Sequence, residues 1–466
     1  MVFSSITFLF YFLPVTLFLY FVVPKRFKNP VLLAASLVFY AWGEKWLVLL
    51  LLLSVAIGYA AGMLMDRWRG KAAARAVFVI STVLLLGFLV YYKYTDFFIA
   101  NFNAVTGLDV RLLGIALPIG ISFYTFQILS YTIDVYRGNV PVQRNPFRLA
   151  TYVTLFPQLI AGPIVRYSTV AEQLAERTHT LEKAAYGVSR FIAGLGKKIL
   201  LANQLGEICS RFKETADGSV LYCWIYAIVF TLQIYFDFSA YSDMAIGLGK
   251  LFGFDFPENF NYPLTAASVS DFWRRWHMTL SSWFRDYVYI PMGGNRVPAA
   301  RLVLNIMVVW LLTGFWHGAS WNFIIWGVLY GLLLLAERFL FKGRIEKLHV
   351  VNHIYVILTV VLGFVLFDAA SLPEAGRVIG GMFGFCDLPA VSQEGLYVLR
   401  SGAVLICLSI LGATPLPKRL YEKLSMTKAG GAILAVAKPV ALGALLLLCT
   451  AYLVDGSYNP FLYFRF

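Results

Sequence analysis

An uncharged stretch of 35 residues, 302–336, constrains the fold of this chain more than any other feature. One membrane-spanning helix needs about 20 apolar residues, so the stretch is too long for one crossing and short for two. Gly314 and Gly318 bracket its single histidine, His317, and allow the chain to bend there. Because basic residues flank both ends, the pattern predicts two short helical segments that rise and return, with Trp316 and His317 deep in the membrane.

The depth of that histidine indicates a function. Ionisable residues are costly inside a bilayer and usually take part in chemistry or transport. The alternative is a histidine that only holds neighbouring helices together through a hydrogen bond. The sequence position favours the functional interpretation of His317.

The chain as a whole is also apolar. Over all 466 residues, hydrophobic residues make up 59% and charged residues 14%, and the mean hydropathy is +0.72; soluble domains are about 25% charged. This composition predicts an all-α polytopic integral membrane protein formed as a single domain, 1–466. The net charge of +14 is spread over short loops, which orients a membrane protein, whereas a nucleic-acid-binding protein gathers such charge on one face.

The distribution of lysine and arginine predicts the topology. These residues are concentrated in loops that we assign to the cytoplasm, and the assignment places both termini on the extracytoplasmic side. The first apolar run, 5–23, has no basic residues before it and is interpreted as a retained helix rather than a signal peptide. The sides of the segments between 164 and 297 stay open, and 151–164 is predicted to be broken by its prolines. Clear crossings are predicted at 350–367, 396–413 and 432–454.

A second informative stretch, 271–289, has the pattern of an amphipathic helix at the membrane interface. An apolar stripe at helical spacing comprises Trp273, Trp276, His277, Leu280, Phe284 and Tyr287. Arginines occupy the opposite face, where they would meet water and phosphate. A simple surface anchor is an equally good interpretation of the composition. The position of His277 on the apolar stripe argues instead that this side chain points into the protein.

Other candidate sites are weaker. Asp237 and Asp243 lie in an apolar run, and buried carboxylates must be paired, so we interpret them as structural polar residues that tie helices together. The five cysteines are scattered and form no metal-binding spacing, and no hydrolase elbow or phosphate-binding loop is present. Neither a metal nor a bound cofactor is predicted. The sequence also shows no internal repeat, which disfavours a transporter built from inverted halves.

Three runs of residues resemble the membrane-bound O-acyltransferase family: YFDFSAYSDMAIGLGKLFGFDFPENFNYP at 235–263, SDFWRRWHMTLSSWFRDYVYIPMGGNR at 270–296 and TGFWHGASWNFIIWG at 313–327. The two ends of the chain are similar to the bacterial alginate O-acetyltransferase branch. The resemblance implies about eleven crossings and re-entrant segments around a central cavity, in the bacterial inner membrane. It also implies that His317 is the catalytic histidine and that His277 is a second active-site histidine.

Acyl transfer to a hydroxyl group requires a base, and a buried neutral imidazole suits that task. The donor implied is acetyl-CoA, a substrate rather than a cofactor. The acceptor is an extracytoplasmic polysaccharide, reached through a periplasmic SGNH-type transferase and the polysaccharide biosynthesis machinery. D-alanyl transfer from a carrier protein and non-catalytic acyl transport are the alternatives. Substrate-binding roles are assigned to Trp316, Asn322, Trp283, Arg274, Arg275 and Arg285.

The aromatic tail, 457–466, is the last candidate. Its composition is typical of an aromatic belt at the outer interface. A related D-alanylation system has a similar ending whose tyrosine is proposed to carry the acyl group. The resemblance therefore makes Tyr463 a candidate acyl carrier between the His317 site and the partner protein.

Overall fold

The computed structural model describes residues 1–215, 218–344, 347–456 and 461–462, and within these ranges every regular element is a helix. The all-α fold class is therefore confirmed. The sequence predicts a single domain, whereas the contacts divide the chain into two compact units. Unit 1 comprises residues 1–191 and 242–257, and unit 2 comprises residues 192–241 and 258–466.

Eight segments of the described ranges are long and apolar enough to cross a membrane. The predicted count of about eleven crossings is not confirmed. One reason is that the first of the eight segments, Lys25–Arg67, contains two helices, which meet where Lys45 takes a positive φ of 48°. A further apolar helical segment, Thr7–Val22, falls short of the length of a full crossing. The predicted crossings at 350–367 and 432–454 each fall inside a single helix.

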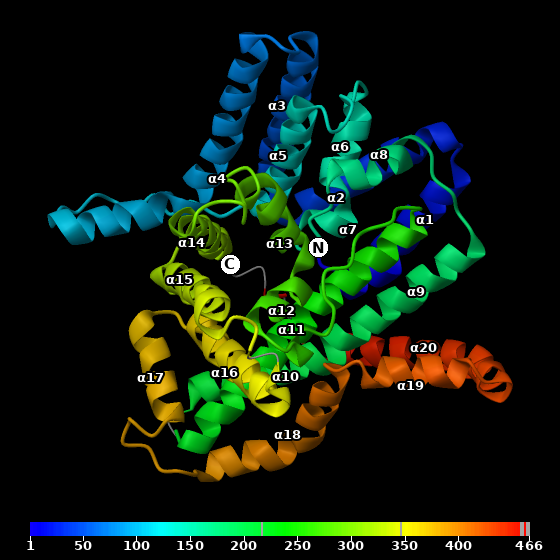
Figure 1. Cartoon of the computed structure of the whole chain (residues 1–466). Coiled ribbons are helices and arrows are strands. Elements are labelled where there is room, and N and C mark those ends of the chain that lie inside the picture. The colour runs from blue at the N-terminus through cyan, green and yellow to red at the C-terminus, as the bar shows by residue number, and fades with distance from the viewer. Residues whose placement is uncertain (216–217, 345–346, 457–460, 463–466) are drawn as a thin grey trace. The chain divides into compact units, whose positions relative to one another are not determined.

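Unit 1 is built mainly from the N-terminal helices (Figure 1). They are α1 (Leu13–Val22), α2 (Lys28–Glu44), α3 (Val48–Arg67), α4 (Ala72–Thr106), α5 (Ile121–Arg137), α6 (Pro146–Thr154), α7 (Phe156–Leu159), α8 (Tyr167–Ala175) and most of α9 (Leu181–Gly196). Helices α3, α4 and α5 pack against one another. Close approach of α3 to α5 depends on Gly58, where an added Cβ would lie 2.5 Å from the Ile128 side chain. The predicted break in 151–164 is confirmed, because α6 ends at Thr154 and α7 begins after one non-helical residue.

Unit 2 carries the remaining helices. They are α10 (Asn203–Glu214), α11 (Val220–Leu251, whose end belongs to unit 1), α12 (Val269–Arg275), α13 (Met278–Phe284), α14 (Ala299–His317), α15 (Trp321–Ala336), α16 (His349–Asp368), α17 (Leu372–Met382), α18 (Gln393–Gly412), α19 (Leu416–Ser425) and α20 (Lys428–Asp455). A continuous aromatic and aliphatic core joins α10, α11, α12, α15 and α16.

Helices α14 and α15 form the helical hairpin predicted from the uncharged stretch. They lie side by side in Figure 1, and the connection at 318–320 directly follows His317. Both segments are long and apolar enough for a full crossing rather than a short one, since the first begins at Ala299 and the second continues to Phe341. Gly314 does not bend the chain as predicted. It lies inside α14, where an added Cβ would collide with the Phe323 carbonyl oxygen, so its role is to let the two helices touch.

The predicted continuous helix over 271–289 is wrong. Helix α12 ends at Arg275, and α13 begins at Met278. Between them His277 adopts a left-handed conformation with φ of 44°, which no α-helix continues through. The stripe is nevertheless buried in protein rather than at lipid headgroups: the Trp273 ring packs on Trp310 at 4.9 Å between ring centroids. The interfacial-anchor interpretation is therefore also wrong.

Candidate active site

A hydrogen-bonded corner holds His277 at the break between α12 and α13. The Asn259 side-chain oxygen accepts hydrogen bonds from the Thr279 backbone N–H at 3.3 Å and the Thr279 hydroxyl at 2.9 Å. The Met278 backbone N–H donates to the Asn259 carbonyl oxygen at 3.0 Å. The same Asn259 oxygen lies 3.0 Å from His277 Nδ1. These contacts replace the helical hydrogen bonds that the left-handed residue interrupts, and they fix the direction of the imidazole.

The corner also sets the tautomer of His277. A backbone N–H always donates, so the Asn259 atom that faces Thr279 must be the amide oxygen, and His277 Nδ1 must carry the proton it donates. His277 Nε2 is then a lone-pair acceptor. It is buried and has no hydrogen-bond partner within the described part of the chain. Burial lowers the pKa of His277 to about 3, so the ring stays neutral near pH 7.

Aromatic rings surround His317, the last residue of α14. Its ring meets Trp316, Trp326 and Phe367 edge to face, with centroids 5.1, 5.2 and 5.2 Å away. The residue is 7% exposed. These neighbours come from α14, α15 and α16, so the hairpin and the next helix together build the surroundings of the imidazole. An apolar environment of this kind keeps water away and strengthens electrostatic interactions with a bound substrate.

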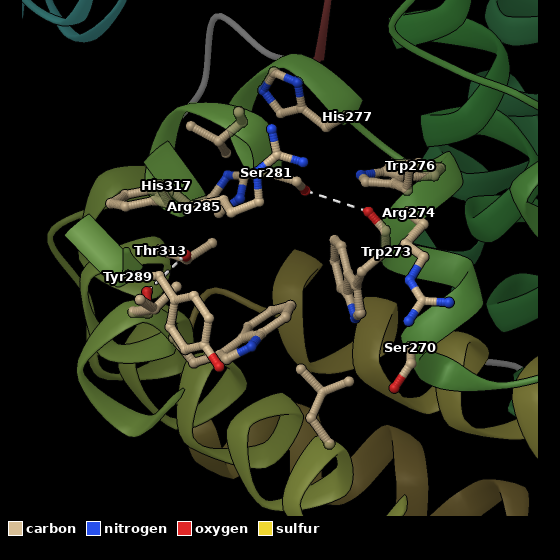
Figure 2. Close-up of a pocket in the computed structure, with 15 residues that line it drawn as sticks. Ser270, Trp273, Arg274, Trp276, His277, Ser281, Arg285, Tyr289, Thr313 and His317 are labelled. Atoms are coloured by element: carbon tan, nitrogen blue, oxygen red, sulfur yellow. Dashed lines mark hydrogen bonds between the residues drawn. The ribbon is translucent and has the colours of Figure 1, made fainter. Parts of the chain in front are cut away.

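His277 and His317 line the same cavity of about 330 Å³ (Figure 2). Trp316 links them, because its ring lies 5.7 Å from the His277 ring and 5.1 Å from the His317 ring. Two exposed arginines, Arg274 and Arg285, line this cavity as well. The structure thus brings the two histidines to one cavity, with a cationic part of the wall beside them.

A second, smaller cavity of about 20 Å³ also touches His317. Its walls include Asp237 from α11, Trp326 from α15 and Leu462 from the C-terminal segment. His317 therefore borders both cavities.

Several predicted binding residues lie outside the walls of both cavities. Arg275 forms a two-point ion pair with Asp271, with Nε–Oδ1 at 3.0 Å and Nη2–Oδ2 at 2.9 Å. Trp283 is buried against Phe284 and Tyr287. The Asn322 side chain donates a hydrogen bond to the Ala369 carbonyl oxygen, which joins the start of α15 to the end of α16. Trp316 contacts both imidazoles without lining either cavity.

The two aspartates of α11 each form an ion pair. Asp237 Oδ1 lies 2.6 Å from Lys198 Nζ, and both side chains are almost completely buried. Asp243 Oδ1 accepts from Arg190 at 3.0 Å and 2.8 Å. Each pair connects α11 to the helical segment between 181 and 202. Within the described residues, no group of three or more His, Cys, Asp and Glu side chains is arranged to hold a metal ion.

Asn259 and Glu337 are site residues that the sequence analysis missed. The buried Glu337 carboxylate accepts from the backbone N–H groups of Val269 at 2.6 Å and Ser270 at 2.9 Å, which fixes the first turn of α12. Asn259 lies in the run 235–263 that carries the family resemblance. Its partner His277 is 18 residues away, so no local spacing links the two. Tyr463 lies outside the described residues, and its role stays a prediction.

Comparison with known proteins decides the family. The model of the membrane-bound O-acyltransferase family matches residues 37–367. The chain belongs to this family. It is 38% identical to a probable alginate O-acetylase AlgI of Azotobacter vinelandii and 39% identical to one of Pseudomonas putida, and both alignments cover both chains in full. A peptidoglycan O-acetyltransferase of Helicobacter pylori is 34% identical over 89% of this chain and 86% of that protein.

Membership of the membrane-bound O-acyltransferase family confirms the resemblance drawn from the three sequence runs. Together with the relatives, it identifies the enzyme class as an O-acetyltransferase with several membrane-spanning helices. Both histidines and both cavity-lining arginines lie inside the matched region.

Proposed function

We propose that this enzyme takes an acetyl group from acetyl-CoA at the cytoplasmic side of the bacterial inner membrane and passes it outward. The final acceptor is a hydroxyl group of an extracytoplasmic polysaccharide, and both chain termini lie on that outer side. The names of the relatives support this proposal, since they are acetylases of alginate or peptidoglycan. The concentration of lysine and arginine in alternate loops supports the orientation.

One observation carries the proposal: two histidines from separate helix breaks line a single cavity whose wall also bears two exposed arginines. Thioester transfer needs a base at the reacting atoms and cations for the phosphates of coenzyme A. Arg274 and Arg285 are suited to the phosphates, because guanidinium groups bind phosphate in a two-point geometry. Arg285 is paired with Asp286 in the structure and would exchange that carboxylate for a phosphate. His277 and His317 supply imidazole nitrogen atoms at the same cavity.

We assign His317 as the general base. It removes the proton of the acceptor hydroxyl while that oxygen attacks the thioester carbonyl carbon, and the carbon–sulfur bond then breaks. The proton passes from His317 to the departing thiolate, which leaves as coenzyme A thiol. His277 is neutral, and its Nε2 is fixed as a hydrogen-bond acceptor. It accepts a hydrogen bond from the acceptor hydroxyl and so orients that hydroxyl toward the thioester carbonyl carbon. The low pKa of His277 makes it a poor base and favours this division of labour.

Tyr463 is our candidate for the first acceptor. A phenol ester is an activated acyl donor, so an acetylated tyrosine at the chain end would pass the group onward readily. The receiver is a periplasmic SGNH-type transferase that acetylates the polymer. The resemblance of the tail to the related D-alanylation system supports this step.

The proposal is tested with purified enzyme in lipid vesicles. Wild-type enzyme mixed with acetyl-CoA should release thiol as its own Tyr463 becomes acetylated, and His317→Ala should not, while the binding of acetyl-CoA is unchanged. Activity with a D-alanyl carrier protein instead of acetyl-CoA would redirect the proposal to D-alanyl transfer. Near-normal polymer acetylation in His317→Gln, which keeps a polar side chain of similar size, would indicate transport without chemistry.

A further inference from the structure

The buried ion pair between Lys198 and Asp237 contacts Phe461 and Leu462, the two described residues that we call the C-terminal segment. Lys198 belongs to a π-helical turn, Lys197–Ala202, and Asp237 to α11. Their side chains are 2% and 3% exposed, and their charged atoms are 2.6 Å apart. Removing two charges from water costs several kcal/mol, and apolar residues often tie helices together at lower cost. The pair therefore calls for a role beyond joining two helical segments.

Each member of the pair offers a second interaction to the same short segment. Asp237 uses its two oxygens differently. Oδ1 lies 2.6 Å from Lys198 Nζ, and Oδ2 accepts a hydrogen bond from the Leu462 backbone N–H at 2.7 Å. Lys198 Nζ lies 4.4 Å from the centroid of the Phe461 ring. A carboxylate that accepts a backbone N–H and an ammonium group over an aromatic face are both recognition contacts for a peptide.

The segment fits closely into this position. Phe461 is 1% exposed, and its ring meets the Tyr241 ring edge to face at 5.0 Å. Leu462 is 8% exposed and forms part of the wall of the 20 Å³ cavity that His317 also lines. Asp237 lines the same cavity. The ion pair thus holds the C-terminal segment beside the space that leads to the imidazole.

We propose that Lys198 and Asp237 form a docking site for the C-terminal segment of this same chain and position it at the small cavity next to His317. The site recognises one aromatic ring and one backbone N–H, at two consecutive residues. Lys198 and Asp237 are positioning residues, since they contact Phe461 and Leu462 and not the reacting atoms. Docking itself is independent of the proposed acetyl transfer; only its purpose, delivery of the tail to the acetyl group, rests on that function.

Hydrogen exchange of the full-length enzyme, read by mass spectrometry, tests the docking. The double variant Lys198→Met/Asp237→Leu replaces both charges by apolar side chains of similar length. We expect exchange of the Leu462 amide to rise about tenfold or more, the effect of losing a hydrogen bond to a charged group. Peptides from α14 and α15 should exchange as in the wild type.

The chain offers a matched control for this variant. Arg190→Met/Asp243→Leu removes the other ion pair that α11 makes with the segment between 181 and 202, and it should leave Leu462 exchange unchanged. Unchanged Leu462 exchange in Lys198→Met/Asp237→Leu would overturn the docking proposal, and so would equal release of the segment in both double variants.

A change in the segment itself guards against misfolding of the double variant. Leu462→Pro removes the N–H that Asp237 accepts, whereas Leu462→Ala keeps it. Exchange of the Phe461 amide should rise in the proline variant and not in the alanine variant; equal exchange in the two would contradict the proposal. If the segment is released and polymer acetylation persists, docking stands and the acetyl relay through the tail fails.

Discussion

The two histidines of the cavity are held in opposite ways. His277 is fixed by polar contacts: one asparagine oxygen holds its Nδ1 and the residues that follow it. His317 is surrounded by rings and ends a helix that packs tightly on its neighbour. A polar corner fixes a tautomer and a hydrogen-bonding direction, whereas aromatic rings give the His317 imidazole an apolar environment. The difference suggests that the first positions the substrate and the second performs the proton transfer.

The largest effect should follow from removal of the enclosed imidazole. His317→Ala should lower the rate of acetyl transfer by about 10²–10⁴-fold, the usual contribution of a general base. The variant should bind acetyl-CoA normally, because no phosphate contact is lost. Thiol release and isothermal titration measure the two properties. Equal loss of binding and transfer would show that His317 acts in recognition instead.

Disruption of the polar corner should have the next largest effect. Asn259→Ala leaves His277 Nδ1 and the Thr279 N–H without their acceptor, which should destabilise the fold by about 1–3 kcal/mol and lower transfer by roughly tenfold, as expected when a positioned group loses its orientation. Thermal unfolding and thiol release measure these changes.

The substitution Asn259→Asp gives the matched comparison. It keeps the acceptor oxygen but adds a negative charge, which raises the pKa of His277 from its low value. The variant should recover much of the stability, and its transfer rate should decline at a higher pH than that of the wild type, because protonated His277 no longer accepts a hydrogen bond. An unchanged pH profile would show that His277 plays no part in transfer.

The next comparison is between arginines that line the cavity and a neighbouring arginine that does not. Arg274→Gln and Arg285→Gln should each raise the KM for acetyl-CoA about three- to tenfold, the worth of one charged hydrogen bond. Arg275→Gln is the control, since Arg275 does not line the cavity. It should leave KM unchanged. A KM increase for Arg275→Gln as large as that for Arg274→Gln would refute the assignment.

Burial of the neutral His277 should produce a smaller, pH-dependent effect on stability. Its pKa is about 3 in the folded chain and 6.5 in the unfolded chain. The unfolded chain therefore binds the extra proton between these values, and stability present above pH 6.5 is lost as the pH falls. The slope is at most about 1.4 kcal/mol per pH unit. His277→Asn should show a shallower decline in thermal unfolding; an identical slope would contradict the buried neutral state.

Local sequence patterns predicted those features of the site that depend on neighbouring residues. The break after His317 follows from an apolar stretch too long for one helix, and the inward direction of His277 follows from its place on the apolar stripe. The left-handed turn at His277 was missed because the helical period continues unbroken across it, while the contacts that stabilise it come from Asn259. The Asn322 contact likewise spans 47 residues. The Arg275–Asp271 ion pair could have been predicted from the sequence, since four-residue spacing places the two side chains on one helix face.

The most direct test of the proposed site is an electron cryomicroscopy structure of the enzyme with a non-cleavable acetyl-CoA analogue. In this analogue a methylene group replaces the thioester sulfur atom, so the acetyl group cannot leave. The acyl carbonyl should lie in the 330 Å³ cavity beside His277 and His317, with the phosphates at Arg274 and Arg285. An analogue bound elsewhere, for example in the 540 Å³ polar groove that Glu207, Arg211 and Glu394 line, would contradict it.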